Sequence, residues 1–437
     1  MTRPVHGGNL AWAATLAGCP ASAILDFSAS ISPLGPPQSA LDAIQSHLSS
    51  LTAYPDPDYG ELRAALGEAL NVDPDWILPG NGSAELLTWA AWDLSKLEAT
   101  YLVTPAFGDY WRALNAFGAK VLECPLDLQS CTIVKNGQDA HSTRDKFSCG
   151  TGILPVPKQV IENGATSFST RDEFSCGTGI LPVPKQVIEN GATSFSTRDK
   201  FSCGTGILPV PKQVIENGAT SFRGLLLNNP HNPTGLLFSR EAIRPYLQQF
   251  PLVVVDEAFM DFLPPEKQES LIDAVAEFPN LVILRSLTKF YSLPGLRLGC
   301  AIAHPDRLRR WQLQRDPWPV NALAALAAAA VVRDAVFERQ TWDWLPVARQ
   351  ELFEGLASLP GLRPFPGAAN FLLVESSVSV ALIQKGLLEH HRILIRDCLS
   401  FPELGDRFFR VAVRDRADNL RLISALKEVI GPLTVDG

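Results

Sequence analysis

Lys289 lies in the stretch SLTKFYSLPGLRLG (residues 286–299), among residue types that a reactive lysine needs. Ser286 precedes it by three positions, and Arg297 follows eight positions later, after a turn-prone Pro-Gly pair. A hydroxyl and a forked guanidinium group can together bind an anion. A lysine amine beside a bound anion can act as a nucleophile toward a carbonyl group. The stretch therefore predicts a nucleophilic lysine next to an anion-binding site.

Three other segments carry polar residues that could join this lysine. Asp256 ends the apolar run PLVVVDEAF, where a carboxylate needs a cation to offset the cost of burial. Asn232 lies in the turn NNPHNPTG, and GNGSAELL places Gly82 and Ser83 at a helix start, where free backbone N–H groups suit a phosphate. Each segment alone also has a purely structural interpretation, as a strand-end ion pair, a turn or a helix cap.

Together these groups are the set that pyridoxal 5′-phosphate requires. A lysine forms a Schiff base with the aldehyde of this cofactor, and an aspartate pairs with the protonated ring nitrogen and keeps the ring an electron sink. An asparagine can hydrogen-bond the phenolic oxygen of the ring. We therefore expect Lys289, Asp256 and Asn232 to meet at one cofactor site.

The elements that position these residues alternate between helix and strand. Helical spacing of apolar residues marks 39–51 and 60–70, and short apolar runs predict buried strands within 99–105, 223–230, 251–259 and 281–289. Buried strands separated by helices indicate an α/β fold with a mostly parallel sheet. Ligands bind at the carboxyl ends of such strands, which is where the polar segments fall.

A nearly perfect repeat interrupts this alternation. A 27-residue segment occupies 142–168 and recurs at 169–195 and 196–222, with changes only at Lys146, Glu173 and Lys200. Natural solenoid repeats share a pattern rather than near-identical letters. We interpret the three copies as a loop-rich surface insertion from a recent duplication.

Composition and charge exclude several classes of function. The net charge is −8 and no Lys/Arg-rich run occurs, so we expect no nucleic-acid partner. The sequence has no signal peptide and no apolar stretch of membrane-spanning length, so we expect a cytoplasmic protein with no membrane partner. Five cysteines are scattered without a CxxC pair and three are copies in the repeat, so we expect no metal site.

Outside the repeats, the chain resembles the fold-type I, aspartate-aminotransferase-like superfamily of pyridoxal-phosphate enzymes over nearly its whole length. The resemblance implies a large domain with a seven-stranded, mostly parallel sheet and a smaller α+β C-terminal domain. The implied division is an N-terminal arm and small-domain segment at 1–40, a large cofactor-binding domain at 41–310 and a small domain at 311–437.

The same resemblance assigns the cofactor contacts. It makes Lys289 the Schiff-base lysine, Asp256 the partner of the ring nitrogen and Asn232 the ligand of the phenolic oxygen. The other residues that it assigns to the cofactor form the phosphate cradle or stack on the ring, and they are Gly82, Ser83, Ser286, Arg297 and Phe107. Tyr54 resembles a tyrosine that reaches the phosphate from the other subunit, which implies a homodimer.

Within this superfamily, two families that act on phosphorylated amino compounds compete. Several stretches, among them HGGN (6–9), DEAFMDFLP (256–264) and DPWPVNALAAL (316–326), are similar to the L-threonine-O-3-phosphate decarboxylases of cobalamin biosynthesis. The histidinol-phosphate aminotransferases commonly have a tyrosine where this chain has Phe259. The resemblance implies decarboxylation to (R)-1-amino-2-propanol O-2-phosphate and CO2 for the cobalamin nucleotide loop. A histidinol-phosphate-type aminotransferase, or a homologue impaired by the insertion, is the alternative.

The decarboxylase resemblance also implies the substrate contacts. Arg410 would bind the α-carboxylate, and the remaining contacts would come from His6, Gly7, Ser30, Asn232 and Arg396. Ser30 and Ser32 depart from the family, which usually has asparagine at both positions.

Overall fold

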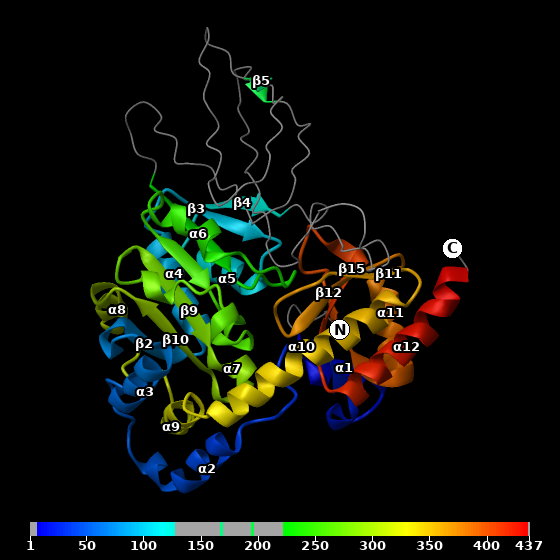
Figure 1. Cartoon of the computed structure of the whole chain (residues 1–437), viewed down its shortest axis with the longest axis horizontal. Coiled ribbons are helices and arrows are strands. Elements are labelled where there is room, and N and C mark those ends of the chain that lie inside the picture. The colour runs from blue at the N-terminus through cyan, green and yellow to red at the C-terminus, as the bar shows by residue number, and fades with distance from the viewer. Residues whose placement is uncertain (1–6, 127–166, 169–193, 196–221, 436–437) are drawn as a thin grey trace.

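We describe the chain from a computed structural model, which covers residues 7–126, 167–168, 194–195 and 222–435. It confirms the predicted α/β fold, with a large seven-stranded sheet and a second, four-stranded sheet nearer the C-terminus (Figure 1). The predicted insertion at 142–222 falls almost wholly outside these residues. Within it, β5 (Ser167–Phe168) and β6 (Ser194–Phe195) are described, and they pair in parallel.

The large sheet is built from the apolar runs expected to be strands. Its described pairs are parallel except for the two that involve β10, which runs antiparallel to β2 and β9. In spatial order the strands are β2 (Ile77–Asn81), β10 (Leu298–Ala303), β9 (Leu281–Ser286), β8 (Val253–Asp256), β7 (Arg223–Asn228), β3 (Ala99–Thr104) and β4 (Val121–Pro125).

Alternate residues of the central strands point into two separate cores, because successive side chains of a strand face opposite ways. Leu226 and Val254 pack into one core, whereas Leu227 and Val255 pack into the other. The helices that supply the first core are α4 (Ser83–Leu94), α5 (Gly108–Ala116) and α8 (Pro305–Gln312). Those that supply the second include α3 (Gly60–Leu70), α6 (Arg240–Leu247), α9 (Ala322–Val331) and α10 (Ala335–Ala357).

Side-chain caps in the sequence set where several helices begin. Ser239 caps α6 by accepting a hydrogen bond from the backbone N–H of Ala242, and Asp334 caps α10 through the N–H of Phe337. The long helix α10 then passes from beside α9 toward the second sheet, where it packs against α12 (Arg416–Val435) (Figure 1). Helix α10 thereby contacts elements next to both sheets.

The second sheet is antiparallel and carries two of the predicted substrate arginines. Its strands, in spatial order, are β11 (Leu362–Pro364), β12 (Phe371–Ser376), β15 (Phe408–Ala412) and β14 (Arg396–Asp397). Helix α11 (Val380–Gly386) continues into a π-helical turn, Leu387–His391, which packs against α12.

The N-terminal segment packs in both regions. Helix α1 (Leu10–Ala17) lies against the π-helical turn, and β1 (Leu25–Asp26) pairs in parallel with β13 (Ile393–Leu394). Helix α2 (Gln38–Ser46) instead packs against α9. The boundaries of the predicted domains at 1–40, 41–310 and 311–437 remain a prediction.

Short 3-10 turns complete the described chain. They are Ala21–Ala23, Leu48–Thr52, Pro74–Trp76, Met260–Phe262, Pro265–Lys267, Ile272–Ala274, Pro294–Leu296 and Gly405–Arg407. In the part of the chain that the structure covers, no helix combines the length and apolarity needed to cross a membrane. The same residues contain no group of three or more His, Cys, Asp or Glu side chains placed to hold a metal ion.

Candidate active site

Lys289 lies on the one-turn helix α7 (Leu287–Phe290), which follows β9 directly. Its Nζ donates a hydrogen bond of 3.2 Å to Ser286 Oγ. Burial lowers the pKa of Lys289 to about 8; Asp256 opposes this shift, and the positive charges of Arg297 and Arg410 add to it. A lysine with such a pKa has a larger neutral, nucleophilic fraction near neutral pH than an ordinary lysine.

Asp256 lies at the carboxyl end of β8 and is held in place by two hydrogen bonds. Its carboxylate accepts one from the Tyr110 hydroxyl at 2.7 Å and one from the Ala258 backbone N–H at 3.0 Å. Burial raises its pKa, while the charge of Lys289 and these two hydrogen bonds act in the opposite direction. Tyr110 was missed in the sequence, although it follows the predicted ring-stacking residue Phe107 by three positions in the first turn of α5.

Residues predicted to form the phosphate cradle lie where α4, β10 and the segment after α7 meet. Gly82 precedes α4 with φ at 76°, and no side chain caps the free N–H groups of this helix start. A Cβ atom at Gly82 would lie 2.5 Å from Nη2 of Arg297, so only glycine lets the guanidinium approach the helix start. Gly299 is equally constrained, since its Cβ would lie 2.6 Å from the backbone N of Ser83. The free N–H groups and the guanidinium suit a phosphate.

Arg410 lies on β15 of the small sheet and connects this sheet to Asn232, which follows β7, and to Ser28 in the N-terminal segment. Its Nη1 donates a hydrogen bond to the side-chain oxygen of Asn232, and its Nη2 donates a bond of 3.4 Å to the Ser28 carbonyl. Burial lowers the pKa of Arg410 to about 10; the charge of Arg396 adds to this effect and Cys398 opposes it. Among the described residues no carboxylate pairs with Arg410, and a buried arginine of this kind suits an anionic ligand.

Arg396 lies directly opposite Arg410, because the two residues are register partners in the β14–β15 pair. Both are buried, with exposed fractions of 7% for Arg396 and 9% for Arg410. Like charges directly opposite on neighbouring strands are destabilising. Arg396 donates a hydrogen bond of 2.6 Å to Ser400 Oγ, and its Nη1 lies 3.9 Å from a carboxylate oxygen of Asp397. An anionic ligand beside these arginines would offset the repulsion between them.

The N-terminal arm reaches the same place. The N–H of Gly8 donates a 2.7 Å hydrogen bond to Ser28 Oγ, and a Cβ at Gly7 would lie 2.3 Å from the Ser28 carbonyl oxygen that Arg410 also contacts. Gly7 and Arg410 thus lie at the same Ser28 carbonyl, and a substrate contact by Gly7 stays a prediction. His6, the other predicted contact of this arm, lies outside the described residues.

The two serines that replace the family's asparagines are both buried. Ser30 Oγ has no hydrogen-bond partner among the described residues. The backbone N–H of Ser32 donates to the Lys289 carbonyl at 3.0 Å, and its own carbonyl accepts from Ser292 Oγ at 2.7 Å. Ser32 thus fixes the segment around α7 through its backbone.

Tyr54 is not brought to this site within the single chain. Its side chain is 80% exposed and its ring stacks on Trp318, with 4.4 Å between ring centroids. Phe107 lies immediately before α5, with its ring edge-on to Tyr110 at 5.8 Å between centroids.

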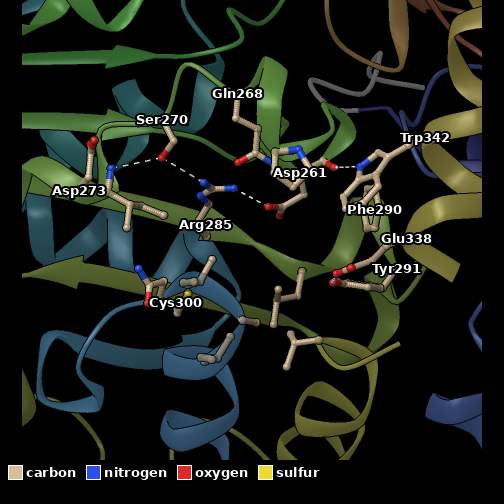
Figure 2. Close-up of a pocket in the computed structure, with 18 of the residues that line it drawn as sticks. Asp261, Gln268, Ser270, Asp273, Arg285, Phe290, Tyr291, Cys300, Glu338 and Trp342 are labelled. Carbon is tan, nitrogen blue, oxygen red and sulfur yellow. Dashed lines mark hydrogen bonds and ion pairs between the residues drawn. The ribbon is translucent and has the colours of Figure 1, made fainter. Parts of the chain in front are cut away.

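Figure 2 shows a cavity of about 350 Å³ that is bordered by the ion pair of Arg285 and Asp261. Arg285 pairs with Asp261 and, at 3.1 Å, with Glu257, which also accepts a 2.7 Å hydrogen bond from Ser270 Oγ. Glu257 follows Asp256 and Arg285 precedes Ser286 in the chain. The ion pairs therefore brace the ends of β8 and β9, from which the site residues project on the other face.

The observed side chains fit pyridoxal 5′-phosphate. The lysine has a lowered pKa, a hydrogen-bonded carboxylate lies in its electrostatic range, and the start of α4 remains uncapped beside a guanidinium. The three atoms nearest to the position of a Cβ at Gly82 all belong to the Arg297 guanidinium. The chemistry of the residues thus matches an aldehyde, a ring nitrogen and a phosphate.

Comparisons with known proteins agree with this geometry. The family profile described as aminotransferase class I and II matches residues 212–426. The threonine-phosphate decarboxylase of Salmonella typhimurium is 33% identical over 430 residues, which cover 97% of this chain and 96% of that protein.

Two solved structures have the same fold. The L-threonine-O-3-phosphate decarboxylase of Porphyromonas gingivalis matches with a TM-score of 0.66 and 22% identity, over 93% of this chain and 100% of that one. The histidinol-phosphate aminotransferase of Sinorhizobium meliloti, solved with pyridoxal 5′-phosphate, matches with a TM-score of 0.69 and 19% identity, over 97% and 95% of the two chains. The chain therefore belongs to the threonine-phosphate decarboxylase family, within the class I and II aminotransferase fold.

Proposed function

We propose that this chain binds pyridoxal 5′-phosphate and decarboxylates L-threonine O-3-phosphate to (R)-1-amino-2-propanol O-2-phosphate and CO2, the aminopropanol unit of the cobalamin nucleotide loop. The observation that carries the proposal is the register pairing of two buried arginines, Arg396 and Arg410, beside the lysine site. A substrate with one carboxylate and one phosphate supplies an anion for each arginine. The similarity to the Salmonella threonine-phosphate decarboxylase over 97% of the chain supports the same substrate.

The cofactor would be held from three sides. Lys289 would bond the aldehyde, Asp256 would pair with the ring nitrogen, and Asn232 would contact the phenolic oxygen. The phosphate of the cofactor would lie among Gly82, Ser83, Ser286 and Arg297, and the ring of the cofactor would stack on Phe107. When bound, the cofactor supplies an electron sink for the pair of electrons left on Cα as CO2 departs.

The protein's own groups would do the remaining work. Arg410 would hold the substrate carboxylate, with Asn232 orienting the guanidinium through the hydrogen bond between them. Arg396 would hold the phosphate at the other end of the substrate. Lys289, whose pKa near 8 lets Nζ give and take a proton at neutral pH, would deliver to Cα the proton that replaces CO2.

Phe259 favours decarboxylation over transamination. In the resembling aminotransferases a tyrosine hydroxyl stands at this position, and Phe259 has no group to donate to the phenolic oxygen. Its ring lies instead 5.1 Å from Lys289 Nζ.

We further propose that the protein acts as a homodimer in which Tyr54 reaches the partner's cofactor phosphate. Tyr54 and Trp318 stack at the surface, and Leu48 and Leu51 nearby in sequence are more than half exposed. A monomer rarely exposes such a group of large apolar side chains, so a second copy is the expected cover. Light scattering on purified protein tests this: the Leu51→Glu variant should become monomeric and lose activity, and a wild-type monomer would refute the dimer.

The reaction is tested by offering purified protein two substrates. Threonine phosphate alone should give aminopropanol phosphate, identified by mass spectrometry, and histidinol phosphate with 2-oxoglutarate should give no product. Lys289→Ala should abolish the reaction, whereas Lys385→Ala, at an exposed lysine on α11, should not change it. Glutamate formation from 2-oxoglutarate would instead establish the aminotransferase.

A further inference from the structure

Two buried phenylalanines from different sheets touch each other within the site. Phe259 follows β8 of the large sheet, and Phe371 begins β12 of the small sheet. Their ring centroids are 5.0 Å apart at an interplanar angle of 79°, the edge-to-face arrangement that aromatic pairs prefer. This contact therefore joins the large-sheet and small-sheet halves of the site.

Each ring also carries one cation of the site. Lys289 Nζ lies 5.1 Å from the centroid of Phe259, and Arg410 Cζ lies 4.7 Å from the centroid of Phe371. Both distances are within the range in which the face of an aromatic ring attracts a cation. The four side chains form a continuous series, cation, ring, ring, cation, across the site.

The two cations would otherwise repel each other in a buried place. The charge of Arg410 contributes to lowering the pKa of Lys289. Each cation lies over the face of one of two touching rings, an attraction that adds no carboxylate to compete with an anionic ligand.

Packing fixes both rings in place. A Cβ at Gly235 would lie 3.1 Å from Gly367 Cα and 3.8 Å from Phe371 Cε2, so two glycine backbones approach closely beside the Phe371 ring. Phe259 stacks on Phe262, with ring centroids 6.5 Å apart. Buried rings packed in this way have little freedom to change rotamer.

We propose that Phe259 and Phe371 are positioning residues that form an aromatic spacer, which sets the distance between the amine of Lys289 and the guanidinium of Arg410. The role rests on the proposed function, because that distance decides whether the amino group and the carboxylate of one amino acid reach both residues together. Neither ring takes part in proton transfer.

The test compares Phe259→Leu, Phe371→Leu, the double variant and a control, Phe365→Leu. Phe365 is also a buried ring with an arginine over its face, but that arginine is Arg363, which the site does not use. Two quantities are measured. The first is the pKa of Lys289 in the cofactor-free protein, from the pH dependence of acetylation at this residue by mass spectrometry. The second is KM and kcat for threonine phosphate in the cofactor-loaded enzyme.

Removing the Phe259 ring takes away an attraction for the ammonium form, so the pKa of Lys289 should fall by ~0.5–1 in Phe259→Leu. Phe371→Leu should raise KM by ~3–30-fold with a smaller change in kcat. In the double variant, the fold-increase in KM should be smaller than the product of the fold-increases in the two single variants, since the two rings touch. Phe365→Leu should alter neither quantity.

Equal effects in the control, or an unchanged Lys289 pKa in Phe259→Leu, would overturn the spacer and leave only core packing. If neither the wild type nor any variant releases CO2, but the pKa of Lys289 shifts as expected, the proposed reaction is wrong. The positioning role of Phe259 toward Lys289 is then still supported.

Discussion

Arg396 and Arg410 are direct register partners in the antiparallel pair β14–β15, and both are buried. A fold selected for stability alone would not place two guanidinium groups opposite each other. The arrangement is explained if a ligand with two negative groups occupies the site during function.

Replacing Arg396 by methionine should separate stability from binding. Because a like charge is removed, the unliganded protein should gain ~0.2–1 kcal/mol, measured by urea denaturation. Threonine phosphate should then bind ~100-fold more weakly, while unphosphorylated threonine should bind as before. Loss of both ligands alike would contradict a phosphate role for this residue.

Gly82→Ala should weaken cofactor binding through the cradle. The new Cβ would lie 2.5 Å from Nη2 of Arg297 and would push the guanidinium away from the start of α4. We expect the dissociation constant of the cofactor, measured by equilibrium dialysis, to rise by ~10-fold or more. Gly118→Ala is the matched control, since Gly118 also has a positive φ, of 67°, but nothing lies within 4 Å of its Cβ position. An equal loss in both variants would assign the effect to backbone strain.

Tyr110→Phe should weaken cofactor binding from the other side of the site. The hydroxyl donates to Asp256 at 2.7 Å and helps to keep this carboxylate ionised against the effect of burial. Its removal should raise the pKa of Asp256 and weaken cofactor binding by ~10-fold, as expected for one hydrogen bond to a charged group. Unchanged binding across pH 5 to 8 would show that the hydrogen bond is dispensable.

Lys289 should make the stability of the cofactor-free protein depend on pH. Its pKa is about 8 in the folded protein and 10.5 ordinarily, so between these values the unfolded chain binds more protons than the folded one. Stability should therefore rise from pH 8 to 10.5, by at most on the order of 3 kcal/mol from this residue. Lys289→Met should be more stable than the wild type below pH 8, and the difference should shrink above it. A constant difference across this range would contradict the lowered pKa.

The sequence predicted well the strands of the large sheet that carry the candidate site residues. Apolar runs ending in polar residues placed Asp256, Asn232, Ser286 and Lys289 at strand ends, because burial on both faces gives parallel strands a strong pattern. The strands β3, β7, β8 and β9 all lie within the runs expected for them.

The parts that were missed depend on tertiary contacts without a local pattern. Tyr110 bonds Asp256 across 146 positions, and the contact between Phe259 and Phe371 joins two sheets. Both arginines were expected in one site, but their direct pairing depends on strand register, which the 14-residue spacing of Arg396 and Arg410 does not specify.

The central claim is that this chain removes CO2 from threonine phosphate with Lys289 as the essential amine. The most direct measurement is the amount of CO2 released per molecule of L-threonine O-3-phosphate consumed, with pyridoxal 5′-phosphate present and no 2-oxoacid. We predict one CO2 per substrate consumed by the wild type and none by Lys289→Ala. Consumption of the amino group without CO2, with the cofactor converted to its amine form, would contradict the claim.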